Sequence, residues 1–120
     1  MRRLRRRREI ERVFRGGRRA QAAVVVLHAR RRESDEAPPS GPRLAVVAGK
    51  KFAGAVPRNR ARRITREASR ALLRGVSEPW DLVLVVRTEV LDQPHRKLLA
   101  ELEMLMRRAS VLPESGAGAG

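Results

Sequence analysis

The sequence predicts an α/β fold of the α+β sandwich type: a small mixed sheet of three to four strands with three helices, in the order α-β-β-(β)-α-β-α. Two observations carry this prediction. Short runs rich in β-branched residues, bounded by charged or turn-forming residues, predict strands at residues 21–29, 44–48 and 80–87. Apolar residues at helical spacing predict helices that begin near residues 9, 57 and 94.

The length of 120 residues suits a single domain, which we place at residues 1–112. The glycine- and alanine-rich end of the chain, residues 113–120, predicts a disordered tail. At the other end, the arginine-rich residues 1–8 are expected to be frayed in the free protein. The segment EIERVFRGG then places Ile10 and Phe14 on one face of a helix, which the glycine pair ends.

Two strands are predicted next, with a polar connection between them. The segments QAAVVVLHA and LAVVA form these strands, and the charged, Pro-containing residues 31–42 between them predict an exposed loop. If this loop closes a hairpin, the two strands lie antiparallel. The pattern leaves open whether residues 50–56 hold one further short strand.

The last third of the chain predicts a central strand and a core helix. The segment WDLVLVVR is nearly all apolar, as is typical of a strand buried on both faces, and a loop follows at residues 88–93. From Pro94 onward, Leu98, Leu102 and Leu105 recur at helical spacing, and Pro113 ends this helix.

The segment between the second and third predicted strands forms a strongly basic helix. Pro57 is typical of a first helical turn, where its missing N–H group costs nothing. At about 100° per residue, two opposite sides emerge. The basic side collects Arg58, Arg60, Arg62, Arg63, Arg66, Arg70 and Arg74. The apolar side collects Ala61, Ile64, Ala68, Ala71 and Leu72.

The excess charge lies in two blocks of the chain. The formal net charge is +15, and residues 1–19 and 50–74 each contribute +8. A solvated helix face is the usual interpretation of mixed charges, where acids stand four residues from bases. In the basic helix arginine stands four residues from arginine instead, and a polyanion would relieve the repulsion. We therefore favour a nucleic-acid partner.

The composition also restricts the location of the protein. The absence of cysteine excludes a disulfide framework and fits a reducing compartment. The apolar runs are too short to span a bilayer, and Glu9 and Glu11 argue against an organelle transit peptide. We expect a cytoplasmic protein without membrane association.

Neither a catalytic nor a metal-binding residue is indicated. Glu9 and Glu11 stand two apart on a helix and point in different directions, and we expect Asp35 and Glu36 to be solvated in the loop. The two histidines, His28 and His95, are far apart in sequence.

The basic helix carries a resemblance to a known family. The segment AVPRNRARRITREASR, preceded by VVAGKKFAG, resembles the Arg-Asn-Arg signature of the bacterial ribonuclease P protein subunit. The order of elements from ERVFRGG to DLVLVVR matches as well, over roughly residues 4 to 112.

The resemblance implies an accessory subunit of an endoribonuclease that matures the 5′ ends of tRNA. It implies a left-handed βαβ crossover, a catalytic RNA subunit that binds the magnesium and performs hydrolysis, precursor tRNA as substrate, and no required protein partner. The RNA-binding residues would be Lys50, Lys51, Arg58, Asn59, Arg60, Arg62, Arg63, Arg66 and Arg70. A cleft for the 5′ leader of precursor tRNA would include Arg7, Ile10, Phe14 and His28.

Two departures from the family pattern stand out. Gly54 occupies a position where related proteins usually have asparagine, and Ile10 and His28 stand where aromatic residues are expected. The alternative function is that of a structural rRNA-binding protein, which would share the charge and size. A helix-turn-helix DNA-binding protein fits less well, because three strands and no paired short helices are predicted.

Overall fold

The computed structural model describes residues 1–113, and the expected disorder of residues 114–120 lies outside this range. Three α-helices and five strands are assigned: β1 (Arg2–Arg3), α1 (Arg7–Gly16), β2 (Arg18–Gln21), β3 (Val25–Arg31), β4 (Arg43–Ala48), α2 (Ala55–Leu72), β5 (Trp80–Val86) and α3 (His95–Arg108), with a 3-10 helix, η1 (Thr88–Asp92), before α3. The predicted α/β sandwich with three helices is confirmed. The sheet is larger than predicted, with five strands in the order β1-β4-β5-β3-β2.

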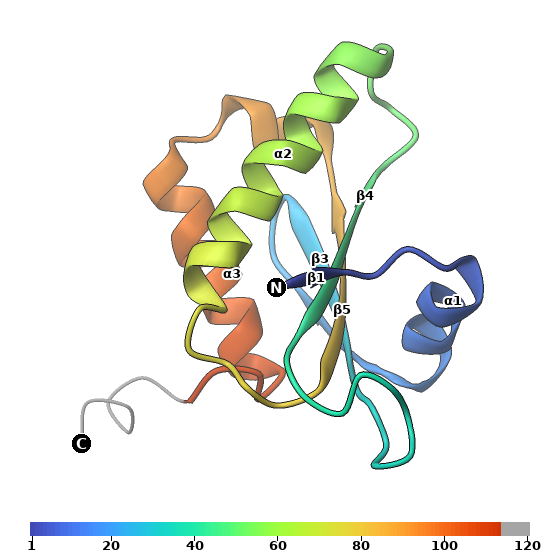
Figure 1. Ribbon diagram of the computed structural model, residues 1–120. Helices are drawn as coiled ribbons and strands as arrows, with labels where there is room; N and C mark the ends of the chain where they lie inside the picture. The colour runs from blue at the N-terminus through green and yellow to red at the C-terminus, as the bar shows by residue number, and fades with distance from the viewer. Residues whose placement is uncertain (114–120) are drawn as a thin grey trace.

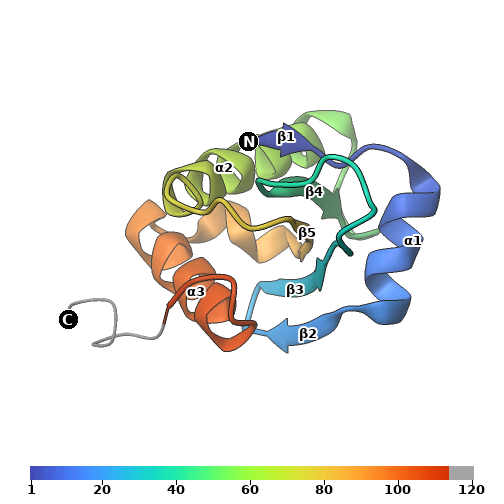
Figure 2. The same cartoon turned by 60° about the horizontal axis from the view of Figure 1, so that its bottom comes forward.

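Strand β5 is the centre of the sheet, as its apolar sequence predicts. It runs antiparallel to β3 and parallel to β4, and six of its seven residues are buried. The connection from β4 through α2 to β5 is a left-handed crossover, which can be followed in Figures 1 and 2. Crossovers of this hand are rare between parallel strands.

The helices cover the two faces of the sheet unequally. Helices α2 and α3 pack on one face, and α1 lies alone on the other (Figure 2). The main core fills the space under α2 and α3, with Leu27, Leu84 and Leu102 fully buried. A smaller cluster under α1 contains Leu4, Val13, Ala45 and Val83. Strand β3 alternates accordingly, since its fully buried residues face the main core and its half-buried residues face α1.

The region predicted as one strand at residues 21–29 contains a turn. Strands β2 and β3 form an antiparallel hairpin, closed by a hydrogen bond from the Ala22 N–H group to the Val25 carbonyl oxygen at 2.9 Å. A hairpin between β3 and β4 does not form, because β5 lies between them and pairs with both. The more apolar strand takes the central place, and this separates two strands that follow each other in sequence.

The amino terminus is ordered in the structure, so the predicted fraying of residues 1–8 is wrong. Strand β1 pairs in parallel with β4, and Leu4 is only 3% exposed. The Leu4 N–H group donates to the Leu44 carbonyl oxygen at 2.9 Å. Burial of this one leucine holds the surrounding arginines against the sheet.

The segment before α2 is a turn, and no strand forms at residues 50–56. Helix α2 starts at Ala55, which places Pro57 in its first turn. Gly54 caps the helix with φ 105° and ψ −174°, a backbone conformation that is essentially restricted to glycine. A residue with a Cβ atom would be strained here, which accounts for the glycine.

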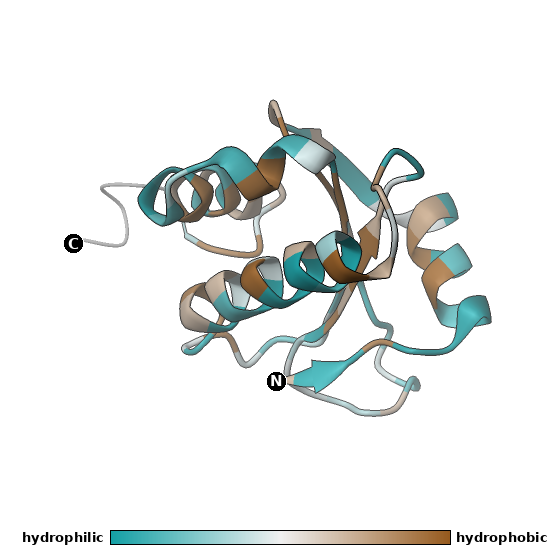
Figure 3. Cartoon of the chain, turned by 90° about the horizontal axis from the view of Figure 1, so that it is seen from above, coloured by the Kyte–Doolittle hydropathy of each residue, from teal (hydrophilic) through white to brown (hydrophobic). Residues whose placement is uncertain are grey.

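The buried side of α2 is rotated from the predicted apolar side. Its fully buried residues are Ala61, Thr65, Ala68 and Ser69, whereas Ala71 is exposed. Leu73, which the helical pattern places among the arginines, is buried just past the helix end. Brown and teal residues alternate along α2 in Figure 3, as expected for a helix with one buried side.

The loop at residues 31–42 is exposed only in part. Arg31 belongs to β3, and Arg32 and Pro42 are buried. Among residues 1–113, no helix is long and apolar enough to cross a membrane.

Candidate RNA-binding surface

The arginines of α2 form two rows that differ in exposure. Arg58, Arg62 and Arg66 are half-buried beside the sheet edge. The outer row is exposed and contains Arg60, Arg63 and Arg70, and the exposed Arg74 follows just past the helix end. Asn59 stands between Arg58 and Arg60 in the chain. Its Oδ1 accepts a hydrogen bond from Arg62 Nη1 at 3.1 Å. This bond holds the Arg62 guanidinium in one orientation.

A groove runs between α2 and the amino-terminal segment. Four arginines line it, Arg3 and Arg5 from the amino terminus and Arg62 and Arg66 from α2. Its floor is apolar and consists of Leu4, Ile10 and residues 44–47. Strand β1 pairs only with Arg43 and Leu44 of β4, so no other strand pairs with the outer edge of β4 along this floor. We call this feature the N-terminal groove.

The electrostatics of the N-terminal groove favour an anion. Burial lowers the pKa of Arg66, and the charges of Arg3, Arg62, Arg70 and Arg5 lower it further. The Arg66 Nε atom is also buried without a hydrogen-bond partner among the described residues. Phosphate groups would supply both the missing acceptor and the missing negative charge.

A second group of predicted site residues lies under and along α1. The rings of Phe14 and His28 meet edge to face, with centroids 4.7 Å apart. Ile10 is half-buried one turn earlier on the same helix and also lines the N-terminal groove. Arg7 points into solvent, with its side chain 93% exposed and paired with Glu11. The structure therefore brings Phe14 and His28 together and leaves Arg7 apart from them.

Phe14 is a surface residue, although helical spacing groups it with core residues. It is 43% exposed, whereas its neighbour Val13 is fully buried. Burial lowers the pKa of His28, and the nearby Arg19 charge lowers it further, so both favour the neutral imidazole. The exposed Phe14 ring, which meets the His28 ring at 82°, offers an aromatic face on which a nucleobase can stack.

The remaining predicted residues, Lys50 and Lys51, are exposed in the turn before α2. Sequence reasoning missed Arg3 and Arg5 as members of the site, because residues 1–8 were expected to be frayed. Leu4 is the one feature that could have indicated otherwise, since a single apolar residue within an arginine run suggests an anchor.

Half of the acids in residues 1–113 are engaged in ion pairs. Glu36 is not simply solvated in the loop, because its carboxylate binds Arg30 at 2.7 Å. Hydrogen bonds from Arg30 lower the Glu36 pKa to about 2. Within residues 1–113 no group of three or more His, Cys, Asp or Glu side chains could hold a metal ion.

A small α/β sandwich that presents two rows of arginine and an arginine-lined groove has the features of a protein that binds a polyanion. The family model for Ribonuclease P matches residues 1–110. The chain therefore belongs to the Ribonuclease P family of protein components.

Individual relatives agree with this assignment. The chain is 37% identical over 120 residues to the ribonuclease P protein component of Roseiflexus sp. RS-1, covering 97% of this chain and 92% of the relative. It is 43% identical over 72 residues to that of Chloroflexus aurantiacus J-10-fl, covering 59% of this chain and 53% of the relative. In that second comparison the chain spans about half the length of the relative. The solved RNase P protein from Thermotoga maritima has a TM-score of 0.75 and 26% identity, covering 90% of this chain and 97% of that one.

Proposed function

We propose that this protein is the protein subunit of ribonuclease P, an endoribonuclease that removes the 5′ leader of precursor tRNA. The family membership supports this function. The observation that carries it within the structure is the pair of arginine rows on α2, of which Arg62 and Arg66 line the N-terminal groove. We further propose that the protein acts in the cytoplasm.

Helix α2 and the turn before it would bind the catalytic RNA subunit. The residues that we assign to this contact are Lys50, Lys51, Arg58, Asn59, Arg60, Arg62, Arg63, Arg66 and Arg70. Repulsion among these side chains is uncompensated in the free protein, because Glu67 is the only acid in the helix. Neutralisation by phosphates therefore contributes to binding, together with release of counterions from the RNA.

The face of the sheet under α1 would bind the 5′ leader. Phe14 and His28 offer a stacking surface, and Ile10 continues it toward the N-terminal groove. Base stacking of this kind contributes about 1–3 kcal/mol per base and tolerates any sequence.

Hydrolysis would be the task of the RNA subunit, which would also hold the magnesium. The protein's own side chains would act by positioning the leader and by reducing repulsion between two RNAs. No protein partner is needed for this role.

One prediction concerns the arginine row next to the groove. Replacing Arg58, Arg62 or Arg66 by Ala is expected to reduce the salt slope of RNA binding by about one unit or less, because each side chain neutralises phosphate. RNA affinity measured from low to moderate salt tests this. An unchanged slope for all three variants would remove this row from the interface.

A second prediction concerns Phe14. Phe14→Ala is expected to weaken binding of precursor tRNA but leave binding of mature tRNA nearly unchanged, since only the precursor carries a leader. The melting temperature should fall less than for a core residue, because Phe14 is 43% exposed. Val13→Ala is the matched comparison, because the adjacent buried residue should instead lower stability. Equal loss of both tRNA affinities in Phe14→Ala would contradict a leader contact.

The proposed function as a whole is tested by crosslinking and capture of the protein from cells, followed by sequencing of the attached RNA. Enrichment of ribonuclease P RNA and tRNA precursors is expected. Enrichment of rRNA alone would support the alternative, a structural rRNA-binding protein.

A further inference from the structure

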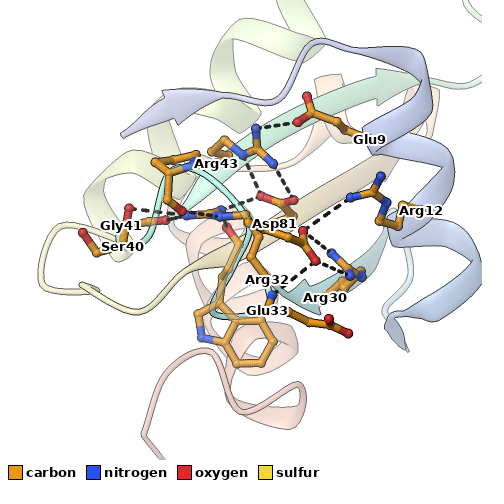
Figure 4. A network of polar contacts seen from close by, with 12 residues as sticks. Glu9, Arg12, Arg30, Arg32, Glu33, Ser40, Gly41, Arg43 and Asp81 are labelled. Atoms are coloured by element: carbon orange, nitrogen blue, oxygen red, sulfur yellow. Dashed lines mark hydrogen bonds and ion pairs between the residues drawn. The ribbon is translucent and has the colours of Figure 1, made fainter.

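Helix α1 is tied to the sheet by two chains of ion pairs. Both start on strands beneath the helix and end on acidic or basic side chains of α1 (Figure 4). One chain ends at Glu9 and the other at Arg12, three residues apart and therefore adjacent on the helix surface.

The first chain runs from the protein interior to the helix. Asp81 of β5 accepts a hydrogen bond from Arg32 Nη1 at 2.6 Å and two from Arg43 at 2.8 Å. The remaining Arg43 nitrogen, Nη1, donates to Glu9 Oε2 at 2.8 Å. The Arg43 side chain is thus held in a fixed direction by Asp81, and Glu9 is placed against it.

The second chain runs through the loop after β3. Both terminal nitrogens of Arg30 donate hydrogen bonds to the Glu36 carboxylate, Nη1 to Oε2 at 3.0 Å and Nη2 to Oε1 at 2.7 Å. The same carboxylate accepts from Arg12 Nη1 at 3.4 Å. Glu36 therefore links a strand under the helix to the helix itself.

The apolar contact between α1 and the sheet is small. Val13 is the only residue of α1 that is fully buried, and no side chain caps the amino-terminal end of the helix. The carboxyl-terminal end is fixed by Gly17, where a Cβ atom would lie 2.7 Å from the Ala29 carbonyl oxygen. Nearer the amino-terminal end, the half-buried Ile10 packs on the same small cluster, and the ion-pair chains add contacts to the strands at Glu9 and Arg12.

We propose that Glu9 and Glu36 are positioning residues for leader binding, which set α1 at the distance and rotation that keep Ile10 and Phe14 in place beside His28 of β3. This inference rests on the proposed function. Neither carboxylate would touch the leader itself. Ion pairs of this kind fix the position of a helix whose apolar contact with the sheet is too small to fix it alone.

The test compares Glu9→Gln with Glu11→Gln. Both changes remove one acid from the same helix, but Glu11 pairs only with Arg7 and Arg15 within α1. Arg43 keeps its two bonds to Asp81 in Glu9→Gln, so no buried charge is left alone. The reconstituted enzyme is assayed in single turnover, with one precursor whose leader spans the cleft and one whose leader is too short to enter it.

For Glu9→Gln, the half-saturating enzyme concentration for the long-leader substrate should rise about twofold to fivefold, the effect expected for losing one ion pair near the surface. The maximal rate and the short-leader value should stay unchanged. Glu11→Gln should match the native protein or bind slightly tighter. Because both variants become more positive, general attraction to RNA would strengthen binding, and a loss confined to Glu9→Gln must come from position.

A second pair of variants guards against a folding defect. Glu36→Gln should reproduce the long-leader effect, while Asp35→Asn, an exposed neighbour in the same loop, should have none. Equal behaviour within both pairs would overturn the inference. If the native enzyme itself does not distinguish long from short leaders, the proposed leader contact fails instead.

Discussion

Asp81→Asn is expected to lower the free energy of unfolding by about 3–5 kcal/mol, because it leaves a buried arginine without its counter-charge. The Arg32 side chain is 0% exposed and the Asp81 side chain 3%. Asparagine keeps the shape of the side chain, removes the charge and replaces one acceptor oxygen by an N–H donor that faces an arginine. Denaturant unfolding followed by circular dichroism measures the change.

Asp35→Asn serves as the control for this measurement. Asp35 is exposed, so its change is expected to remain within about 0.5 kcal/mol of the native protein. If Asp81→Asn lowers the free energy of unfolding by less than about 1 kcal/mol, the carbonyl oxygens around the Arg32 guanidinium satisfy its hydrogen bonds without Asp81. Arg32 donates to the Pro38 and Trp80 carbonyl oxygens at 2.9 and 3.1 Å, and these bonds would then suffice.

Purified protein is expected to leave precursor tRNA intact at any magnesium concentration, and to lower the magnesium needed when the RNA subunit is added. The acids that could bind a metal are held by arginines instead, as Glu9 and Asp81 both are by Arg43. Cleavage of precursor tRNA across a magnesium series, with each component alone and both together, provides the measurement.

Single substitutions extend this prediction to individual side chains. Replacing Glu9, Glu11, Glu67, His28 or His95 should change the single-turnover rate at saturating protein by less than about tenfold. General acid–base groups contribute about 10²–10⁴-fold, so the two outcomes are well separated. A loss of that size in one variant, with folding and RNA binding intact, would make the protein a participant in the chemistry.

The local sequence pattern was sufficient to predict the three helices, the strands β3, β4 and β5, and the basic surface. The helical spacing of Leu98, Leu102 and Leu105 and the apolar run of β5 predicted a core helix and a central strand, and both are present. The basic side of α2 was also predictable, because helical period alone places side chains that are four residues apart on one side. Charge blocks and signature residues are properties of the chain and need no tertiary structure.

Strand neighbours and the amino terminus depended on tertiary structure. Nothing in the local sequence shows that β5 separates β3 from β4. The strand whose burial removes the most apolar surface from water takes the central place, and this depends on the whole sheet. Leu4 likewise anchors β1 only because Val13, Ala45 and Val83 come together beneath it. The N-terminal groove follows from that anchor, because it places Arg3 and Arg5 opposite Arg62 and Arg66.

The ion-pair network was equally beyond sequence reasoning. By itself, the sequence determined the three helices, the strands β3, β4 and β5, the two basic blocks and the arginine rows of α2, all of which depend on residues close together in the chain. Only the tertiary structure decided that Arg32 and Arg43 converge on Asp81, from positions 49 and 38 residues away. Such pairs form because a charge that folding removes from water must find a partner, and the fold decides which one is within reach.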